Sequence, residues 1–386
     1  MKYNFDQIID RRNSYSKKWL KYRDSDVIAM TVADMEFSAP PPILNALAKE
    51  IDHGVLGYTL YQMELKQTVI SYLKDQYSWD VQEEEIIWLP SIVAGMNICS
   101  RILTTNNQPI ISATPIYPPF FQTATNSQRQ LIKTQLILNE HWEWDFADLE
   151  KQLAQNKTDG GLLLLCNPHN PTGRVWSRNE LERLLDIASR YKLNICSDEI
   201  HCDLILNKNL KHIPFASLNS EAATRSVVLM SPAKTFNIPS LSCAFAVIQN
   251  PAIRQNFEEF MRGLYPQINI MGLIACKTAL TECQEWKKQL IEYLQNNHNL
   301  TLEKINKMPG LVAKKSEATY LLWVNCTEFC DKTGINNPFS FFEKHGIALG
   351  NGADFGMSNY FRLNFACPEE QLTEALHRIE DALKKA

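Results

Sequence analysis

A single lysine stands in an apolar stretch of the chain. In LMSPAKTFNIPSL, residues 229–241, Lys234 is the only charged residue, and Ser231 precedes it by three positions. Lysine is almost never fully buried unless a partner pairs with it or a reaction uses it. Taken alone, such a lysine usually extends its amine to solvent along an apolar stem. The alternative is an amine held ready to act as a nucleophile.

Each of four short apolar runs, which read as strands, is followed by polar side chains. With the run that each follows, they are Tyr117 (110–113), Asn167 and Asn170 (161–166), Asp198 and His201 (193–197), and Ser231 and Lys234 (226–230). In open α/β sheets, ligands bind beyond the carboxyl ends of the strands. We therefore expect an aromatic ring, a carboxamide, a carboxylate, a hydroxyl and an amine to converge at one rim of a sheet.

This set of groups fits pyridoxal phosphate (PLP). The Lys234 amine can form a Schiff base with the aldehyde, and the Asp198 carboxylate can keep the pyridine nitrogen protonated, so that the ring accepts electrons. The Tyr117 ring can stack on the pyridine, and Asn170 or Asn167 can reach the ring hydroxyl. Singly, the aspartate could only cap a helix and the asparagines could only form turns. Those readings do not explain why all of them follow strands of one sheet.

A phosphate group needs free backbone N–H groups at the start of a helix. The segment after Ser91 offers such a start, with Ile92 and Val93 as its first residues. The hydroxyl of Ser231 can add a further hydrogen bond. His201, three residues after the candidate aspartate, is expected near the ring of the cofactor.

The elements that carry these residues read as an α/β fold with a mostly parallel sheet. The continuous apolar run 161–166 is typical of a strand covered on both faces. Residues 177–180 fit a capping box that opens a helix, and 193–197 returns to strand, so this segment forms a βαβ unit and implies a parallel sheet. Further strands are expected at 86–88, 226–231 and 243–248, and a further helix at 93–103.

The 386 residues exceed the size of one small core and predict two domains. A long amphipathic helix over 284–308 predicts a bridge between them. Strands at 320–324 and 361–365 and a final helix from about Glu369 then read as a smaller α+β domain. We expect an N-terminal arm at 1–47 that joins the small domain, a large PLP-binding domain at 48–285, and a small C-terminal domain at 286–386.

The composition argues against several other classes of protein. The net charge of −4 offers no basic patch for nucleic acid, and the lysine pairs at 17–18 and 384–385 are expected to be solvated surface. The N-terminus lacks the apolar region of a signal peptide, and the apolar run 160–166 is too short to cross a bilayer, so we expect a cytoplasmic protein without a membrane partner. Five cysteines in apolar segments are expected to be small buried hydrophobes: Cys99, Cys166, Cys196, Cys243 and Cys276. Neither the pair Cys326 and Cys330 nor His201 beside Cys202 has the spacing of a zinc site.

In this order, four motifs resemble the fold-type I PLP enzymes of the aminotransferase class I/II superfamily. They are NPHNPTG at 167–173, SDEIH at 197–201, SPAKTFNI at 231–238 and FRLNFACP at 361–368. Within that superfamily the chain is most similar to the MalY/PatB-type cystathionine β-lyases, also called C–S lyases. The supporting stretches are FDQIIDRRNSYSKKW, VADMEF, GYT at 57–59 and TPIYPPF at 114–120. Together these matches cover nearly the whole chain.

The resemblance implies roles for individual residues. Lys234 would be the Schiff-base lysine, Asp198 would pair with the ring nitrogen, and Asn170 would reach the ring hydroxyl. Arg362 would bind the α-carboxylate of the substrate, a bidentate task that suits a planar guanidinium. Tyr58 would reach the cofactor phosphate of the neighbouring subunit, which implies a homodimer.

The chain departs from the family pattern at several positions. An aromatic residue usually stands where Thr31 is, a glycine-led turn often precedes the phosphate-binding helix where Ser91 is, and Ala-Gly commonly follows KTFNI where this chain has Pro239 and Ser240. A glycine-rich run usually precedes RLN, where this chain has 358–360, Ser-Asn-Tyr. These departures affect the shape of the pocket and therefore the choice of substrate.

The function that follows is β-elimination of cystathionine or a related cysteine S-conjugate, giving a thiol, pyruvate and ammonia. Lys234, Asp198 and Tyr117 are the candidate catalytic residues, with the freed lysine amine as general base. An aminotransferase is the alternative, because the same groups serve both reactions. A second arginine for a distal carboxylate would separate the two, and the sequence does not identify one. A regulatory protein with residual lyase activity is a further alternative.

Overall fold

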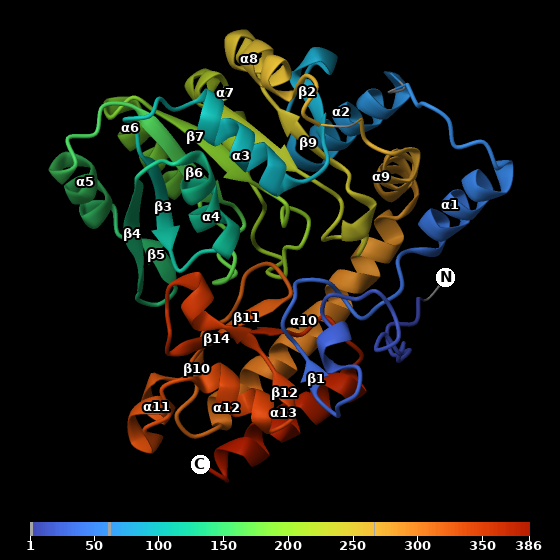
Figure 1. Ribbon diagram of the computed structural model, residues 1–386, viewed down its shortest axis with the longest axis vertical. Helices are drawn as coiled ribbons and strands as arrows, with labels where there is room; N and C mark the ends of the chain where they lie inside the picture. Colours follow the sequence, from blue (N-terminus) through green and yellow to red (C-terminus); the bar gives the residue numbers. More distant parts are fainter. Residues whose placement is uncertain (1–2, 61–62, 266) are drawn as a thin grey trace.

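A computed structural model of the chain describes residues 3–60, 63–265 and 267–386. Figure 1 shows a larger part built on a wide sheet, a smaller part below it, and an N-terminal arm that lies against the smaller part. The long helix α10 (Gln284–Lys307) runs from the larger part into the smaller one. Among the described residues, no helix has the length and apolar character needed to cross a membrane.

The larger part contains an eight-stranded sheet. Its strands, in spatial order, are β2 (Ile86–Leu89), β9 (Ala244–Val247), β8 (Ser226–Met230), β7 (Leu193–Asp198), β6 (Gly161–Cys166), β3 (Ile110–Thr114), β4 (Leu131–Leu138) and β5 (Trp142–Trp144). The neighbours from β8 to β4 pair in parallel, whereas β9 is antiparallel to both β8 and β2, and β5 is antiparallel to β4. The predicted mostly parallel sheet is confirmed.

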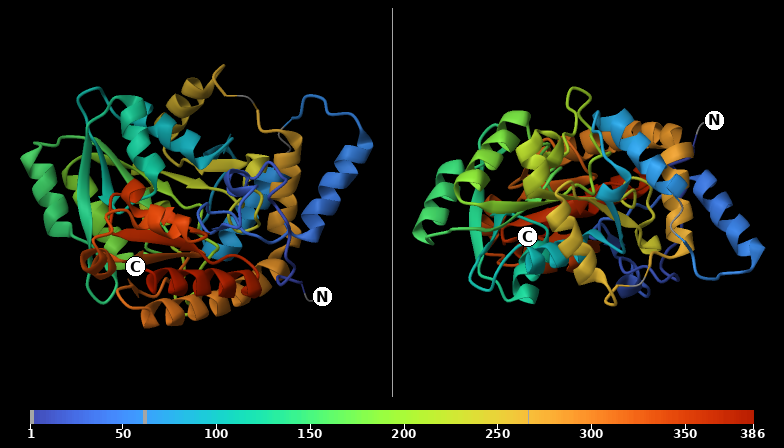
Figure 2. Two further views of the ribbon diagram at one scale, coloured as in Figure 1. Left: turned by 60° about the horizontal axis from the view of Figure 1, so that its bottom comes forward. Right: turned by 90° about the horizontal axis from the view of Figure 1, so that it is seen from above.

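Helices cover both faces of this sheet, as the view from above in Figure 2 shows. One face carries α3 (Ile92–Ile102), α4 (Pro118–Ser127) and α8 (Pro251–Met261). The other carries α2 (Met63–Tyr77), α5 (Phe146–Gln155), α6 (Arg178–Arg190), α7 (Ser220–Arg225) and α9 (Ile270–Glu282). Because both faces are covered, β6 is buried at every position.

Local sequence signals explain where the site-bearing helices begin. The side chain of Ser177 accepts from the amide of Glu180, whose own side chain returns to the amide of Ser177, so the predicted capping box opens α6. Ser91 caps α3 by accepting from Ala94. A Cβ on Gly95 would lie 2.7 Å from a methyl group of Leu229, so the glycine lets the start of α3 pack tightly on β8.

The smaller part is built on a four-stranded antiparallel sheet in the order β10 (Val312–Ala313), β11 (Leu321–Asn325), β14 (Tyr360–Asn364) and β13 (Gly350–Asn351). Around it lie α11 (Thr327–Thr333), α12 (Pro338–Lys344), α13 (Glu369–Leu383) and the 3₁₀ turn η5 (Gly352–Phe355). The core of this part includes Tyr320, Leu363 and Phe365, all fully buried.

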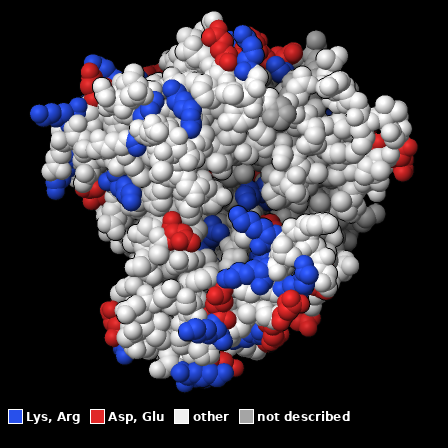
Figure 3. Space-filling view, viewed as in Figure 1, with Lys and Arg blue, Asp and Glu red and all other residues white. Residues whose placement is uncertain are grey.

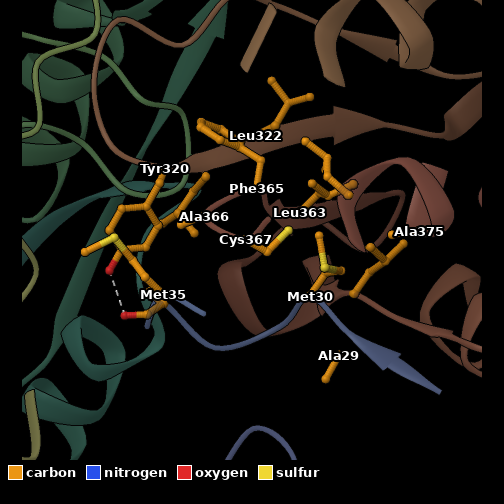
Figure 4. Packing of buried hydrophobic residues seen from close by; sticks show 14 of the residues in the cluster. Ala29, Met30, Met35, Tyr320, Leu322, Leu363, Phe365, Ala366, Cys367 and Ala375 are labelled. Atoms are coloured by element: carbon orange, nitrogen blue, oxygen red, sulfur yellow. Dashed lines mark hydrogen bonds between the residues drawn. The ribbon is translucent and has the colours of Figure 1, made fainter. Parts of the chain in front are cut away.

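The N-terminal arm belongs structurally to the smaller part. Its strand β1 (Ile28–Ala29) pairs in parallel with β12 (Ile347–Ala348), and Figure 4 shows Met30 and Met35 packed among residues of the C-terminal core. The arm then leads into α1 (Pro41–His53), which lies at the outer edge of the larger part (Figure 2). Residues far apart in sequence therefore form one core.

The lysine pair at 17–18 was expected at the surface, and this expectation is wrong for Lys18. Lys18 is buried with its Nζ 2.6 Å from the Oε1 of Glu36 and 3.4 Å from the Oδ1 of Asp34. Trp19 donates its indole N–H to the other oxygen of Glu36. The acidic partners lie in the following segment of the arm, so the pair could not be seen from the local sequence. Lys17 is exposed, as expected.

Candidate active site

The cavity between the two parts gathers nearly all the predicted site residues. It has a volume of about 520 Å³ and lies beyond the carboxyl ends of β3, β6, β7 and β8. Its lining includes Lys234, Asp198, Tyr117, Asn170, His201, Ser231, Ile92, Val93 and Arg362. Tyr58 and Asn167, the alternative to Asn170, do not line it.

Lys234 lies in the turn after β8, and its Nζ donates to the backbone carbonyl of Ala33, 2.6 Å away. The same carbonyl accepts from the hydroxyl of Tyr320 at 2.9 Å (Figure 4). Burial lowers the pKa of Lys234 to about 8, with the positive charge of Arg362 acting in the same direction. The amine is therefore held by a neutral acceptor in the cavity, and it loses its proton more readily than an ordinary lysine.

Asp198 ends β7 as a buried carboxylate, and among the described residues it has no ion-pair partner. Its Oδ1 accepts from the amide of Ile200 at 3.1 Å. Burial raises the pKa of Asp198 to about 7, although the Ile200 amide and the charge of Lys234 oppose the rise. A buried carboxylate without a cation is costly, and a protonated ring nitrogen is a group that would offset this cost.

Asn170 and Arg362 lie together at the other side of the cavity. The guanidinium donates through Nη1 to the Oδ1 of Asn170 at 3.0 Å and through Nη2 to the carbonyl of Thr31 at 2.8 Å. Its Nε is buried without a partner among the described residues, and its Cζ lies over the ring of Phe355, 4.7 Å from the ring centre. Arginine has five N–H groups in a fixed fork, so donors remain for a carboxylate. Burial lowers the pKa of Arg362 to about 10, so it is charged near neutral pH.

Asn167, the alternative to Asn170, does not line the cavity. Its side-chain amide donates to the carbonyl of Ile213.

Tyr117 is the N-cap residue of α4 and lines the cavity, and burial raises the pKa of its hydroxyl. His201 is buried with its Nδ1 free of any partner among the described residues, and its ring meets that of Tyr320 edge to face at 6.1 Å.

The start of α3 forms the end of the cavity where the phosphate is expected. Ile92 and Val93 are the first two residues of that helix, and the first amides of a helix have no acceptor within it. Ser231 also lines the cavity, but its hydroxyl donates to the carbonyl of Cys243 at 2.7 Å and accepts from the amide of Ala233. In this structure it holds the turn before the reactive lysine, and its phosphate contact stays a prediction.

Sequence reasoning missed several residues of the cavity wall. Thr31 and Ala33 act through backbone carbonyls, which carry no signature of residue type. Asp354 and Ser242 also line the cavity and belong to no motif that we singled out. Lys17 lines it too; it lies in a stretch that carries the resemblance, but it was expected only as solvated surface. Pro239 lines the cavity too, whereas its neighbour Ser240 does not, so of these two departures only the proline shapes the pocket directly.

A second, larger depression of about 1110 Å³ contains none of the predicted site residues. Arg174 lines it, but this arginine is already bound by Glu317 at 2.6 Å and Glu180 at 2.8 Å. The convergent reactive groups lie in the smaller cavity, which is the candidate active site.

A family model for aminotransferase class I and II matches residues 25–379. The chain belongs to this family. It is 31% identical to cystathionine beta-lyase PatB of Bacillus subtilis, over 98% of this chain and all of PatB. Among solved structures, OvoB is 41% identical with a TM-score of 0.95 over the full length of both chains. The PLP-bound C–S lyase of Staphylococcus hominis is 30% identical with a TM-score of 0.93, over 99% of this chain and 98% of that one.

These comparisons confirm the resemblance inferred from the motifs, and they confirm the PLP-dependent transferase fold. Because the fold is that of PLP-dependent enzymes, the cavity residues can be compared with what PLP requires. The residues fit PLP on three observations: an amine on a neutral acceptor, a buried carboxylate without a cation, and a helix start at the opposite end. The roles of individual residues toward the cofactor remain predictions.

Proposed function

We propose that this protein is a PLP-dependent C–S β-lyase that cleaves cystathionine or a related cysteine S-conjugate to a thiol, pyruvate and ammonia. The observation that carries the proposal is the placement of Lys234 and the unpaired, buried Asp198 in one cavity. Full-length similarity to cystathionine β-lyases and C–S lyases supports the same conclusion.

When bound, the cofactor supplies an electron sink for the electrons left when the Cα–H bond breaks. Arg362 holds the substrate α-carboxylate through its remaining N–H groups, and Asn170 keeps the guanidinium in place. The Lys234 amine, with its pKa near 8, takes the Cα proton as general base. Asp198, a buried carboxylate without an ion-pair partner among the described residues, would keep the ring nitrogen protonated. Loss of the Cα proton and cleavage of the Cβ–S bond release the thiol, and water then completes the conversion to pyruvate and ammonia.

The test is a product assay on the purified holoenzyme with cystathionine. We expect pyruvate and homocysteine to appear in equal amounts without any added keto acid. Lys234→Ala should abolish this turnover, because it removes the general base, whereas Lys344→Ala, at an exposed lysine outside the cavity, should retain it. Near-normal activity of the Lys234 variant would refute the assignment.

An aminotransferase is the second candidate, because the matching family model carries that name. Among the described residues, Arg362 is the only arginine that lines the cavity. Within the described ranges, the cavity therefore lacks the second arginine expected of an aminotransferase for dicarboxylic substrates. A keto acid that formed only when an amino acceptor was added would instead establish transamination.

We also propose that the protein works as a homodimer. Tyr58 is fully exposed in the single chain, and apolar side chains around it are exposed as well: Leu44, Ile51, Val55, Leu56 and Leu60. Such a patch is typical of a protein–protein interface. In the dimer, Tyr58 reaches the phosphate of the cofactor in the partner subunit.

A further inference from the structure

The mouth of the active-site cavity carries two charges of opposite sign. Lys17 and Asp354 both line the cavity, and both are exposed, whereas Arg362 and Asp198 at its inner end are buried. Figure 3 shows basic side chains gathered along the hollow between the two parts, with acidic atoms at its edge. The proposed mechanism uses the buried inner groups and leaves these two charges without a task.

The backbone around Lys17 is fixed by its neighbours. The hydroxyl of Ser16 accepts from Arg11, and the adjacent Lys18 is buried in its ion pair with Glu36. The neighbouring side chains of the arm are thus held in the interior, while Lys17 extends into the mouth of the cavity. Its position follows from a rigid anchor rather than from a free tail.

The position of Asp354 is fixed from the opposite side. It lies in η5, where the side chain of Asn351 caps the turn by accepting from the amide of Ala353. The next residue, Phe355, accepts an amide hydrogen bond from Ile116 of the larger part at 3.0 Å and packs its ring under Arg362. Asp354 is therefore held next to the wall that contains the predicted carboxylate-binding arginine.

Neither charge is neutralised within the described part of the chain. Lys17 takes part in no ion pair there, and the only hydrogen bond of Asp354 is a long one, 3.4 Å, from the Nδ2 of Asn351. Three other charged residues of the same arm are paired: Arg11 with Asp34, Lys18 with Glu36 and Lys21 with Glu343. Lys17 and Asp354 therefore line the cavity as charges without an ion pair in the described part of the chain.

We infer that Lys17 and Asp354 select substrates whose sulfur carries a second amino-acid head group. This inference rests on the proposed function, which places the first head group at Arg362. The distal carboxylate of the leaving group binds Lys17, and its distal ammonium binds Asp354. The substrate class is therefore two α-amino acids joined through sulfur, and S-alkyl conjugates without a charged distal end are poorer substrates.

Three substrates that differ only at the distal end test this inference. Cystathionine carries both charges, S-(3-aminopropyl)cysteine lacks the distal carboxylate, and S-(3-carboxypropyl)cysteine lacks the distal ammonium. The holoenzyme is assayed for pyruvate with each, and kcat/KM is compared. We expect wild-type enzyme to prefer cystathionine over both analogues, with the difference mainly in KM.

Each of the two variants, Lys17→Ala and Asp354→Asn, should reduce the preference for cystathionine over one of the two analogues. In Lys17→Ala the ratio of kcat/KM for cystathionine over the aminopropyl analogue should fall about fivefold, the size expected for an exposed charge pair. The ratio over the carboxypropyl analogue should be kept. Asp354→Asn should show the reverse pattern. Lys344→Ala and Asp24→Asn, at exposed positions outside the cavity, are the matched controls and should keep both ratios.

The outcomes distinguish the role of Lys17 and Asp354 from the lyase activity itself. Unchanged ratios in both variants, or a parallel loss for all three substrates, would overturn the role of the two charges while leaving the lyase activity established. If the wild-type holoenzyme releases no pyruvate from any of the three, the proposed function itself fails, and the inference fails with it.

Discussion

At the scale of single residues, Asp198 combines a cost in stability with a predicted task. Its pKa is raised to about 7 by burial, so above that pH the folded chain holds a desolvated carboxylate. Asp198→Asn removes the charge and keeps an oxygen that can accept from Ile200. In the protein stripped of cofactor, we expect this variant to be more stable than wild type at pH 8 by on the order of a few kcal/mol.

The sign of this effect sets its pH dependence. Because the folded-state pKa of Asp198 lies above the ordinary value of 3.8, the cost is present in full above about pH 7 and disappears as the pH falls toward 4. Urea unfolding at both pH values measures it. The holoenzyme variant should lose most of its lyase activity, since the ring nitrogen loses its anionic partner. If the Asp198→Asn variant gained no stability at pH 8, burial of the ionised Asp198 carboxylate would not destabilise the folded protein.

The same scale shows what the sequence can predict. Lys234, Asp198 and Asn170 were found because their side chains suit one chemistry and follow predicted strands, whereas Arg362, inside a predicted strand, was found only through the resemblance to the family. The structure places all four in one cavity. The acceptor of the lysine amine was not found, because it is the backbone carbonyl of Ala33. Every residue has such a carbonyl, and only the folded chain shows which one is used.

At the scale of elements, the N-terminal arm forms part of the cavity wall and is anchored by a buried ion pair. Lys18→Ala removes the ammonium between Glu36 and Asp34, whose side chains retain Arg11 as a partner. We expect a loss of stability on the order of 2 kcal/mol, since breaking a buried pair leaves a partly uncompensated charge. Lys17→Ala, one residue earlier and exposed, is the control and should unfold at the wild-type urea concentration. Equal midpoints for the two variants would contradict the anchor.

Elements with a strong local pattern were predicted close to their observed bounds. The strand at 161–166 and the capping box of α6 are examples, because a continuous apolar run and a cap each have a local cause. Strands β4 and β5 were not predicted. They form an antiparallel pair at the edge of the sheet, where β4 alternates buried and exposed residues and the outer strand has only three residues, so the apolar signal is weak.

At the scale of the whole molecule, the exposed apolar patch beside α1 predicts that two chains associate. Leu56→Glu places a charge in this patch and should shift the protein from dimer to monomer in sedimentation experiments. It should also weaken binding of PLP, because the site then lacks its partner. Tyr58→Phe should keep the dimer and lower cofactor affinity by about tenfold, the value of one charge-assisted hydrogen bond. A monomeric wild-type protein with full cofactor affinity would refute this assembly.

The pairing of the first and last parts of the chain also bears on how the protein is made. Thr31 receives the guanidinium of Arg362, and β1 pairs with β12. Synthesis on the ribosome delivers the arm first and its partner strands more than three hundred residues later. Until then, the apolar side of the arm has no permanent cover. The nascent chain can fold the larger part early, but a complete active site exists only after the segment with β12 and Arg362 has left the exit tunnel.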